Sequence, residues 1–530
     1  MTEELHHECG VAALYWLNEA YNGSRDGQAS ELVVNDDVTP LMSPLLLDLQ
    51  NRGQLAAGIS SYNPKRVQVL DTFKDVGRVS EVFRMSHPGK YKAIMEEYAG
   101  RAVIGHTRYA TCGADDSRYA QPFERHHGRA WKWFTFAFNG NLSNYRELRE
   151  RLLSRRDYII TLDTDTEIIM HMLAYQLRHD SPPDLAKVMS ELAVDFDGAY
   201  NIVFLDAKGR MFVCRDPLGL RPLCWAVQGK LFGVASESMA LSNLGFDDIH
   251  SLEPGMMGIV EEGRLRFERF APSTRKAHCF FEWVYFSNVG SVQDDSSVYL
   301  SRSRAGKILA AKEDQNVKGD DVVVVPVPDT AKAAADSFAF ALGIPCMEGL
   351  IRNRYVGRTF IQPGSSRGMT VRSKYTPQPA LLKGRKVFLV DDSIVRCTTM
   401  KALVKRLKEF GKAREVHVRV ACPPIIAPCF YGIDMSTLGE LFAHRYIDEN
   451  YAGDLTPQQE KTMAAELGVD SLRYLSVDDL SASILMPKNH LCTGCVLGKY
   501  PTDYGNRLMC AARKNDAEGK IGRTYESCNS

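Results

Sequence analysis

At 530 residues the chain is too long for a single hydrophobic core, so two or more domains are expected. Its 65 basic and 65 acidic residues balance, which argues against binding to nucleic acid or to an anionic membrane surface. No stretch approaches the roughly 20 apolar residues of a membrane span, and the acidic N-terminus lacks the order of a secretory signal, so a cytoplasmic protein is expected. Thirteen cysteines favour thiols and metal ligands over disulfides in such a protein.

The first candidate site is Cys9, at the start of the strand-like apolar run ECGVAALYWL. Taken by itself, a single cysteine near a terminus is better explained as a buried structural thiol. Six later segments, however, resemble in order a class II (N-terminal nucleophile) glutamine amidotransferase domain. They are Asn51–Gln54, Gly105–Thr111, Phe138–Leu142, Asp163–Glu167, Arg215–Pro222 and Ala235–Ser238. The resemblance implies an α+β N-terminal nucleophile hydrolase sandwich, although Asn51 stands where this family has His.

The same resemblance implies that Cys9 is the nucleophile. A thiol of ordinary pKa about 8.5 needs a base, and an α-amino group of pKa about 7.7–8.0 can serve if it belongs to the cysteine itself. Residues 1–8 are therefore expected to be a propeptide whose removal exposes Cys9. Attack on the side-chain amide of glutamine creates an oxyanion, which the family stabilises with the Asn-Gly pair, here Asn139 and Gly140. An Asn-Gly pair after an aromatic run is also typical of a hairpin turn.

The substrate glutamine would be held by charged side chains of the same domain. By the resemblance, Arg108 pairs with the α-carboxylate, Asp165 accepts the α-ammonium group, and Arg52 of the Asn51–Gln54 segment lies in the wall of the site. Without the resemblance, each of these residues would be an ordinary solvated surface charge.

A second candidate site is KVFLVDDSIVRCTTM, residues Lys386–Met400. Val387–Val390 has the continuous apolar character of a buried strand, the carboxylates Asp391 and Asp392 follow it, and Lys401–Phe410 has the spacing of a helix. Backbone N–H groups at a helix start attract phosphate, and carboxylates accept hydrogen bonds from ribose hydroxyls or hold magnesium, so the pattern suits a phosphorylated sugar. The bare pattern also fits an ordinary strand, loop and helix with acidic capping residues.

LVDDSIVRCTT resembles the phosphoribosyl pyrophosphate (PRPP) signature of type I phosphoribosyltransferases, in the form found in the glutamine PRPP amidotransferase family. The resemblance implies that Asp391 and Asp392 bind ribose hydroxyls and magnesium. It also implies a cradle for the 5-phosphate, consisting of Ser393, Arg396, Thr398 and Thr399. Cys397 stands where the family has Gly, which permits close approach of a phosphate to the backbone.

Two further segments match this family. Asp321–Val325 is a predicted buried strand, and the turn after it places Thr330 where a magnesium-linked hydroxyl is expected. The segment RNRYVGRTFIQP, which contains Arg352 and Arg358, resembles the basic loop that closes over PRPP and excludes water.

Cysteines near the C-terminus form a third candidate site. Cys492 and Cys495 make a C-x-x-C pair, which is compatible with zinc, redox chemistry or an iron–sulfur cluster. Cluster-bearing members of the family take two more ligands from segments that match Cys279 and Cys429, and four thiolates fit a 4Fe–4S cluster. Zinc bound by the same four residues is the open alternative.

Together these matches predict a propeptide (1–8), a glutamine amidotransferase type 2 domain (9–262), an α/β phosphoribosyltransferase domain (263–475) and a ligand-bearing tail (476–530). The family implies conversion of glutamine and PRPP to 5-phosphoribosylamine in the first committed step of purine synthesis, with Mg²⁺, purine nucleotide inhibitors and a homo-oligomer. Two alternatives are open. One is a glutaminase whose transferase half has become a nucleotide sensor, which Cys397 suggests. The other is a different class II amidotransferase, although the DDSIVR stretch has no place in such an enzyme.

Overall fold

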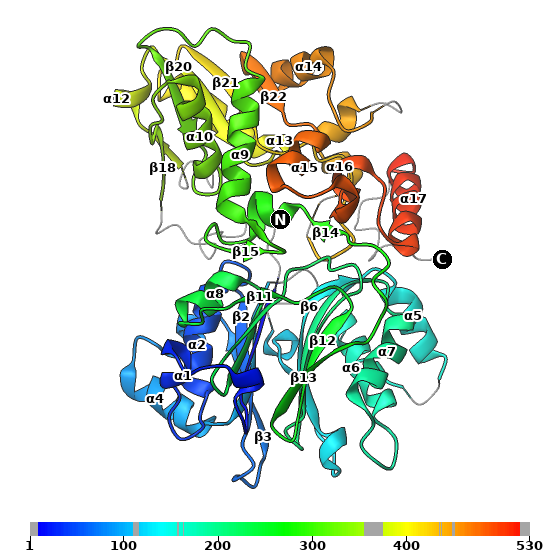
Figure 1. Cartoon of the computed structure of the whole chain (residues 1–530). Coiled ribbons are helices and arrows are strands. Elements are labelled where there is room, and N and C mark those ends of the chain that lie inside the picture. Colours follow the sequence, from blue (N-terminus) through cyan, green and yellow to red (C-terminus); the bar gives the residue numbers. More distant parts are fainter. Residues whose placement is uncertain are drawn as a thin grey trace.

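The computed structural model describes residues 9–109, 116–155, 158–162, 164–353, 375–433, 435, 437–447 and 451–519. Two units lie one above the other, with the sandwich of the first unit at the bottom of Figure 1. The predicted propeptide and Arg358 lie outside the described residues. No helix of the described part has the length and apolar character needed to cross a membrane.

The first unit contains two antiparallel sheets. One has seven strands in the order β11 (His250–Ser251), β9 (Cys224–Gln228), β10 (Leu231–Ala235), β1 (Gly10–Trp16), β4 (Ala102–Arg108), β2 (Ala56–Tyr62) and β3 (Leu70–Val76). The other has six, in the order β13 (Arg264–Arg269), β12 (Met256–Glu261), β8 (Met211–Arg215), β7 (Gly198–Asp206), β6 (Phe134–Leu142) and β5 (Phe123–Arg125).

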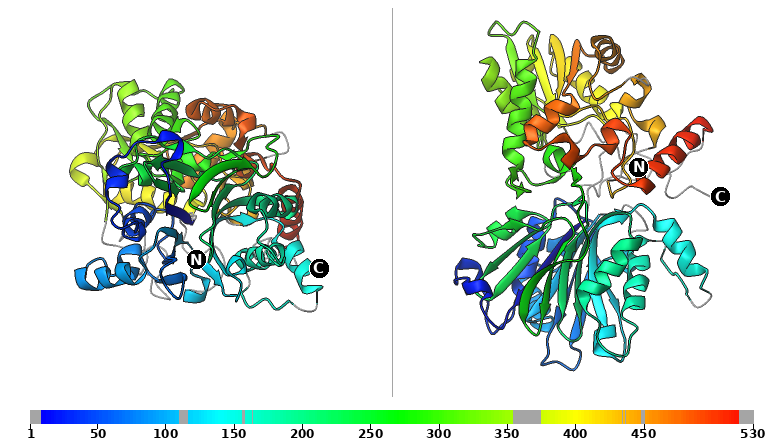
Figure 2. Two further views of the ribbon diagram at one scale, coloured as in Figure 1. Left: turned by 60° about the horizontal axis from the view of Figure 1, so that its bottom comes forward. Right: turned by 45° about the vertical axis from the view of Figure 1, so that its right-hand side comes forward.

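Helices cover the outer face of each sheet, which gives a four-layered sandwich (Figure 1; Figure 2, right). The seven-stranded sheet carries α1 (Gln28–Glu31), α2 (Thr39–Asp48), α3 (Val79–Val82), α4 (Pro88–Glu97) and α8 (Ser238–Asn243). The six-stranded sheet carries α5 (Tyr145–Leu153), α6 (Asp165–Gln176) and α7 (Leu185–Asp195). A third apolar cluster fills the space between the sheets, because alternate residues of strands such as β1 and β7 face inward. The predicted sandwich is confirmed.

Two sequence-based details of this unit need correction. The Asn139-Gly140 pair does not form a hairpin turn, since β6 continues through both residues and pairs with β7 as far as Leu142. The six-stranded sheet of the first unit also extends beyond the predicted domain boundary at residue 262, because β13 pairs with β12 along its whole length.

The second unit is built on a parallel sheet in the order β17 (Val322–Pro326), β20 (Lys386–Asp391), β21 (Glu415–Val420) and β22 (Ser471–Tyr474). Helices α9 (Val298–Ala311) and α10 (Lys332–Leu342) pack on one face, and α13 (Cys397–Glu409) and α14 (Pro457–Leu467) on the other. Strands β17 and β20 are apolar on both faces, as a parallel sheet covered on two sides requires. The predicted α/β domain is confirmed, but α13 begins four residues before the predicted start at Lys401.

Short elements complete this unit and join it to the tail. Strand β14 (His278–Cys279) pairs with β23 (Leu491–Cys492), β15 (Val292–Gln293) with β16 (Ser296–Ser297), and β18 (Leu350–Arg352) with β19 (Tyr375–Pro377). The remaining helices are the π-helix η4 (Glu282–Phe286), α12 (Pro379–Leu382), η6 (Leu438–Glu440), η7 (Ala443–Tyr446), α15 (Val477–Ile484), η8 (Lys488–His490), α16 (Gly494–Leu497) and α17 (Asp503–Ala517). Short 3₁₀ turns in the first unit are η1 (Tyr21–Gly23), η2 (Ser117–Tyr119) and η3 (Ala130–Lys132).

Candidate active sites

Cys9 lies immediately before β1, in the middle of the seven-stranded sheet, and its side chain is half-buried. Its Sγ is 3.7 Å from the carbonyl oxygen of Tyr109. Burial raises the pKa of the Cys9 thiol, while the nearby guanidinium groups of Arg108 and Arg52 act in the opposite direction and the Asp165 carboxylate adds to the rise. The charges of all three predicted glutamine-binding residues therefore act on the Cys9 thiol, which needs a base to form a thiolate.

The predicted oxyanion donors lie at the end of β6. Asn139 is 1% exposed, and its Nδ2 is 3.4 Å from the hydroxyl oxygen of Ser236, which also accepts a hydrogen bond from the backbone N–H of Val11 in β1. Gly140 has φ of 149°, and a Cβ there would lie 2.0 Å from the carbonyl oxygen of Ala199. Only glycine fits this position, because a side chain would collide with the backbone of the neighbouring strand β7.

Asp165 is the first residue of α6, whose start is capped by the Thr164 hydroxyl. The Asp165 carboxylate accepts a 3.2 Å hydrogen bond from the N–H of Leu142, which ties the start of α6 to the end of β6. Burial raises the pKa of Asp165 to about 6, despite the hydrogen bonds that favour its ionised form. A carboxylate that is poised in this way can accept a substrate ammonium group at neutral pH.

This pKa leads to a prediction for the pH dependence of glutamine hydrolysis. Asp165 must be ionised to accept the ammonium group, so its contribution is lost as pH falls through about 6. We expect a plot of log kcat/KM for glutamate release against pH to become steeper below about pH 6, and the variant Asp165→Asn to lack this break. An unchanged break in the variant would assign it to another group.

Arg52 is part of a buried ion-pair network at the junction of the units. Its Nε lies 2.7 Å from a carboxylate oxygen of Glu237, and its Nη2 lies 2.6 Å from one of Glu282. Asn51, the residue that replaces the family's His, donates to Glu237 at 2.8 Å and to the carbonyl oxygen of Phe286 at 3.2 Å. The guanidinium of Arg52 thus has structural partners beyond any substrate, and its contact with glutamine stays a prediction.

The second site lies at the carboxyl edge of the parallel sheet. Strands β17 and β20 are neighbours, with Pro326 opposite Val390, so the turns that follow them are adjacent. The Thr330 hydroxyl donates to Oδ2 of Asp392, and the Ser393 hydroxyl donates to Oδ1 at 2.6 Å. Asp392 is buried and Asp391 half-buried, and burial raises the pKa of Asp392. These are oxygen ligands of the kind that magnesium takes.

The phosphate end of this site is the start of α13. Arg396 is the residue before the helix, and Thr398 and Thr399 lie in its first turn, where backbone N–H groups lack intrahelical partners. The guanidinium of Arg396 also pairs with Glu440 at 3.2 Å, and Nη2 of Arg445 lies 3.9 Å from Sγ of Cys397. Across the sheet edge, Arg352 pairs with Asp329 at 3.0 Å.

The four predicted cysteine ligands line one small cavity between the units. Strands β14 and β23 pair Cys279 with Cys492, Cys495 lies in α16, and Cys429 is brought alongside by the chain that follows β21. Within the described residues, no group of three or more His, Cys, Asp or Glu side chains is placed to hold a single metal ion. Burial raises the pKa of Cys279 to about 11 and that of Cys492 and Cys495 further.

Sequence reasoning missed three buried charged residues around these sites: Glu237, Glu282 and Arg302. Both glutamates belong to segments that match the family, ASES and FEWVYF, but nothing in the letters indicates that they are partners of Arg52. Arg302 lies on α9 among alternating Ser and Arg residues, and no sequence signal distinguishes it from a solvated arginine.

Comparisons with known proteins match both units. A family model described as a glutamine amidotransferase domain matches residues 106–243, and one described as a phosphoribosyl transferase domain matches residues 300–424. The amidophosphoribosyltransferase of Methanothermobacter thermautotrophicus is 37% identical, over 94% of this chain and 95% of that protein. The Bacillus subtilis enzyme of the same name is 35% identical over the same shares of the two chains.

The fold agrees with these matches. The structure of B. subtilis glutamine PRPP amidotransferase, described as a complex with ADP and GMP, has a TM-score of 0.77 and 33% identity, and the match covers 94% of this chain and 98% of that one. The two folds and their sites define a glutamine amidotransferase joined to a phosphoribosyltransferase. Given the identity along nearly the whole length, the chain belongs to the amidophosphoribosyltransferase family. It is therefore a pentosyl-transferring glycosyltransferase that acts at the first step of purine biosynthesis.

Proposed function

We propose that this chain makes 5-phosphoribosylamine by carrying ammonia internally from glutamine at Cys9 to PRPP at Asp391 and Asp392. One observation supports the proposal most directly: the same short helix, η4, borders both sites. Its first residue, Glu282, pairs with Arg52 beside Cys9, and its Trp283 and Val284 line a cavity that Asp392 also lines. A route between the sites can therefore run inside the protein, where ammonia is protected from protonation by solvent.

The first half-reaction takes place in the amidotransferase unit. The Cys9 thiolate attacks the side-chain amide carbon of glutamine, while Asn139 and Gly140 donate hydrogen bonds to the oxyanion. The carbon–nitrogen bond breaks, ammonia leaves, and water hydrolyses the thioester to glutamate and the free thiol. Arg108 and Asp165 hold the two charged groups on the α-carbon of the substrate.

The second half-reaction takes place in the transferase unit. Ammonia displaces pyrophosphate at the anomeric carbon of PRPP, which Asp391 and Asp392 hold through its ribose hydroxyls. The backbone at the start of α13, with Ser393, binds the 5-phosphate. Thr330, Asp391 and Asp392 supply the oxygen ligands suited to Mg²⁺, which when bound offsets the negative charge of the pyrophosphate group. The contacts of Thr330 and Ser393 with Asp392 favour a working transferase over the degenerate alternative.

The base for Cys9 requires processing of the chain. As long as residues 1–8 are attached, the nitrogen of Cys9 is a peptide N–H and cannot accept a proton. Burial raises the pKa of the thiol, which makes a neighbouring base more necessary. We therefore include removal of residues 1–8 in the proposal, with the new α-amino group of Cys9 as the base.

Mixing the purified, processed protein with glutamine, PRPP and magnesium tests this function. The proposal predicts that glutamate and pyrophosphate appear in equal amounts. Glutamate without pyrophosphate would instead support a glutaminase with a degenerate transferase unit.

For the cysteine cavity we propose a 4Fe–4S cluster rather than zinc. Tetrahedral zinc with Zn–S bonds of about 2.3 Å requires sulfur atoms about 3.8 Å apart. A cluster has its iron atoms at separate corners, so its ligands stand further apart, which agrees with the finding that, among the described residues, no three such side chains are placed around a single metal ion. The high pKa values of these buried thiols mean that a bound metal group must drive their deprotonation. The cluster would tie the tail to the junction of the units, in a structural or oxygen-sensing role.

Removal of one ligand tests the cluster. We expect protein purified without oxygen to be brown and to contain about four iron and four sulfide per chain. Cys429→Ser should lose the visible absorption and melt at a lower temperature, since the tail loses its anchor, whereas Cys510→Ser, at an exposed position on α17, should change neither. One zinc per chain and no iron would contradict the proposal.

Regulation and assembly follow the family. The B. subtilis structure contains ADP and GMP, and we propose that purine nucleotides inhibit this chain as well. We also propose a cytoplasmic homo-oligomer, with domain boundaries close to those given by the sequence and the first boundary placed after β13.

A further inference from the structure

Helix η4 is held at its first residue by the amidotransferase unit. Nη2 of Arg52 lies 2.6 Å from Oε2 of Glu282, and its Nη1 lies 3.3 Å from Oε1. The same Nη2 donates to the Ser287 hydroxyl at 3.1 Å, which in turn donates to Glu282 at 2.7 Å. Arg52 and Glu282 are each 1% exposed, so the ion pair is desolvated and its geometry is fixed.

Helix η4 is also held by the transferase unit, from its second residue, Trp283, to Ser287, the residue that follows it. Arg302, on α9, donates from Nε to the carbonyl oxygen of Trp283 at 2.8 Å. Its Nη2 donates to the carbonyl oxygens of Tyr285 at 3.2 Å and of Ser287 at 2.9 Å. Carbonyl groups at the end of a helix lack intrahelical partners, and a guanidinium has enough donors to satisfy several of them at once.

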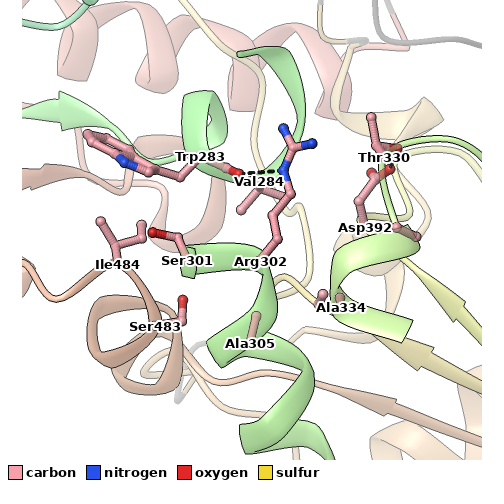
Figure 3. A pocket seen from close by; sticks show the side chains of 12 residues that line it. Trp283, Val284, Ser301, Arg302, Ala305, Thr330, Ala334, Asp392, Ser483 and Ile484 are labelled. Carbon is pink, nitrogen blue, oxygen red and sulfur yellow. Dashed lines mark hydrogen bonds between the residues drawn. The ribbon is translucent and has the colours of Figure 1, made fainter. Parts of the chain in front are cut away.

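Arg302 also faces the predicted PRPP site. Arg302, Asp392 and Thr330 line a small cavity, with Arg302 on one wall and Thr330 and Asp392 on another (Figure 3). Arg302 and Asp392 are each 7% exposed, so little water screens the attraction between their charges. Burial lowers the pKa of Arg302 to about 10, and Asp392 is the strongest of the charges that oppose this change.

We propose that Arg302 is a positioning residue that couples occupation of the PRPP site to the glutamine site through η4. The proposal rests on the proposed function, because Asp392 is taken to bind PRPP with magnesium. Binding of PRPP and magnesium at Asp392 changes the charge that Arg302 faces. The hydrogen bonds from Arg302 to the carbonyl groups of η4 change as a result. Glu282, the residue next to Trp283 in the same helix, then shifts Arg52, whose charge acts on Cys9.

The test measures glutamate and pyrophosphate separately in Arg302→Gln, Arg302→Lys and a matched control, Arg304→Gln. Arg304 lies on the same helix and donates to the carbonyl oxygen of Ser483 at 2.6 Å, a residue of α15 and not of η4. With glutamine and PRPP, we expect glutamate released per pyrophosphate to rise about fivefold or more in Arg302→Gln. Arg302→Lys should show a smaller excess, since an ammonium keeps the charge but cannot reach all three carbonyls. Arg304→Gln should keep the ratio of the unmodified protein.

The same variants are assayed with ammonia and PRPP, and with glutamine alone. Because Arg302 lines the same cavity as Asp392, pyrophosphate release from ammonia in Arg302→Gln measures any direct damage to the transferase site, and lost coupling is a rise in the glutamate ratio larger than that damage explains. A one-to-one ratio in folded Arg302→Gln would overturn the proposal. Should that variant fail to fold, as a thermal melt would reveal, Arg302→Lys decides: an excess of glutamate supports the coupling and a one-to-one ratio overturns it. If the unmodified protein releases no pyrophosphate from ammonia and PRPP, the proposed function has failed instead.

Discussion

Replacing Cys9 with alanine should abolish glutamine-dependent formation of 5-phosphoribosylamine, by at least about 10³-fold, while ammonia-dependent formation stays within about twofold. The large loss is expected because no other group can form the thioester from which ammonia is released. Ammonia supplied in solution bypasses that step, and the transferase site contains no part of Cys9. The measurement is pyrophosphate release with either nitrogen source.

Cys224→Ala is a matched control for this variant. Cys224 is a buried cysteine in β9 of the same sheet, so its loss creates a similar small cavity without removing a reacting group. It should keep both activities. Glutamine-dependent activity that survives in Cys9→Ala would exclude Cys9 as the nucleophile.

Replacing Asp392 with asparagine should reduce the rate of pyrophosphate release with either nitrogen source by roughly 10- to 10³-fold. The substitution removes a buried carboxylate that accepts hydrogen bonds from the ribose hydroxyls and ligates magnesium. Glutamate release should continue, since the amidotransferase unit is untouched. Assays of pyrophosphate with ammonia and of glutamate with glutamine measure the two effects separately.

The control is Asp321→Asn, at the amino end of β17, where Asp321 pairs with Arg414 on the surface. It removes one carboxylate from the opposite edge of the same sheet and should leave both rates unchanged. Equal losses in Asp392→Asn and Asp321→Asn would show that general damage to the sheet, and not the PRPP site, is being measured.

Much of the fold was accessible from the sequence because its buried strands are continuous apolar runs. Val322–Pro326 and Lys386–Asp391 were predicted within a residue or two, and with them the place of Thr330 and Asp392. The start of α13 was predicted too late. Its first turn, from Cys397, faces the phosphate site and so lacks the apolar spacing that reveals a helix from Met400 onward.

Other features depend on partners that are distant in the chain. The Asn139-Gly140 pair has the letters of a turn, but pairing with β7 carries β6 straight through it. Arg302 is buried against η4 because α9 packs on the junction of the units. The residues around Arg302 in the sequence do not indicate this packing. Charged residues that act through buried pairs are therefore the part of the site that sequence reasoning finds least well.

Tracing nitrogen distinguishes internal transfer of ammonia from Cys9 to PRPP from release of ammonia into solution. The processed protein is given PRPP, magnesium and glutamine with an isotopically labelled side-chain nitrogen, in the presence of excess unlabelled ammonium. With internal transfer, 5-phosphoribosylamine should carry mainly the label from glutamine. A product labelled only in proportion to the mixed ammonia pool in solution would contradict it.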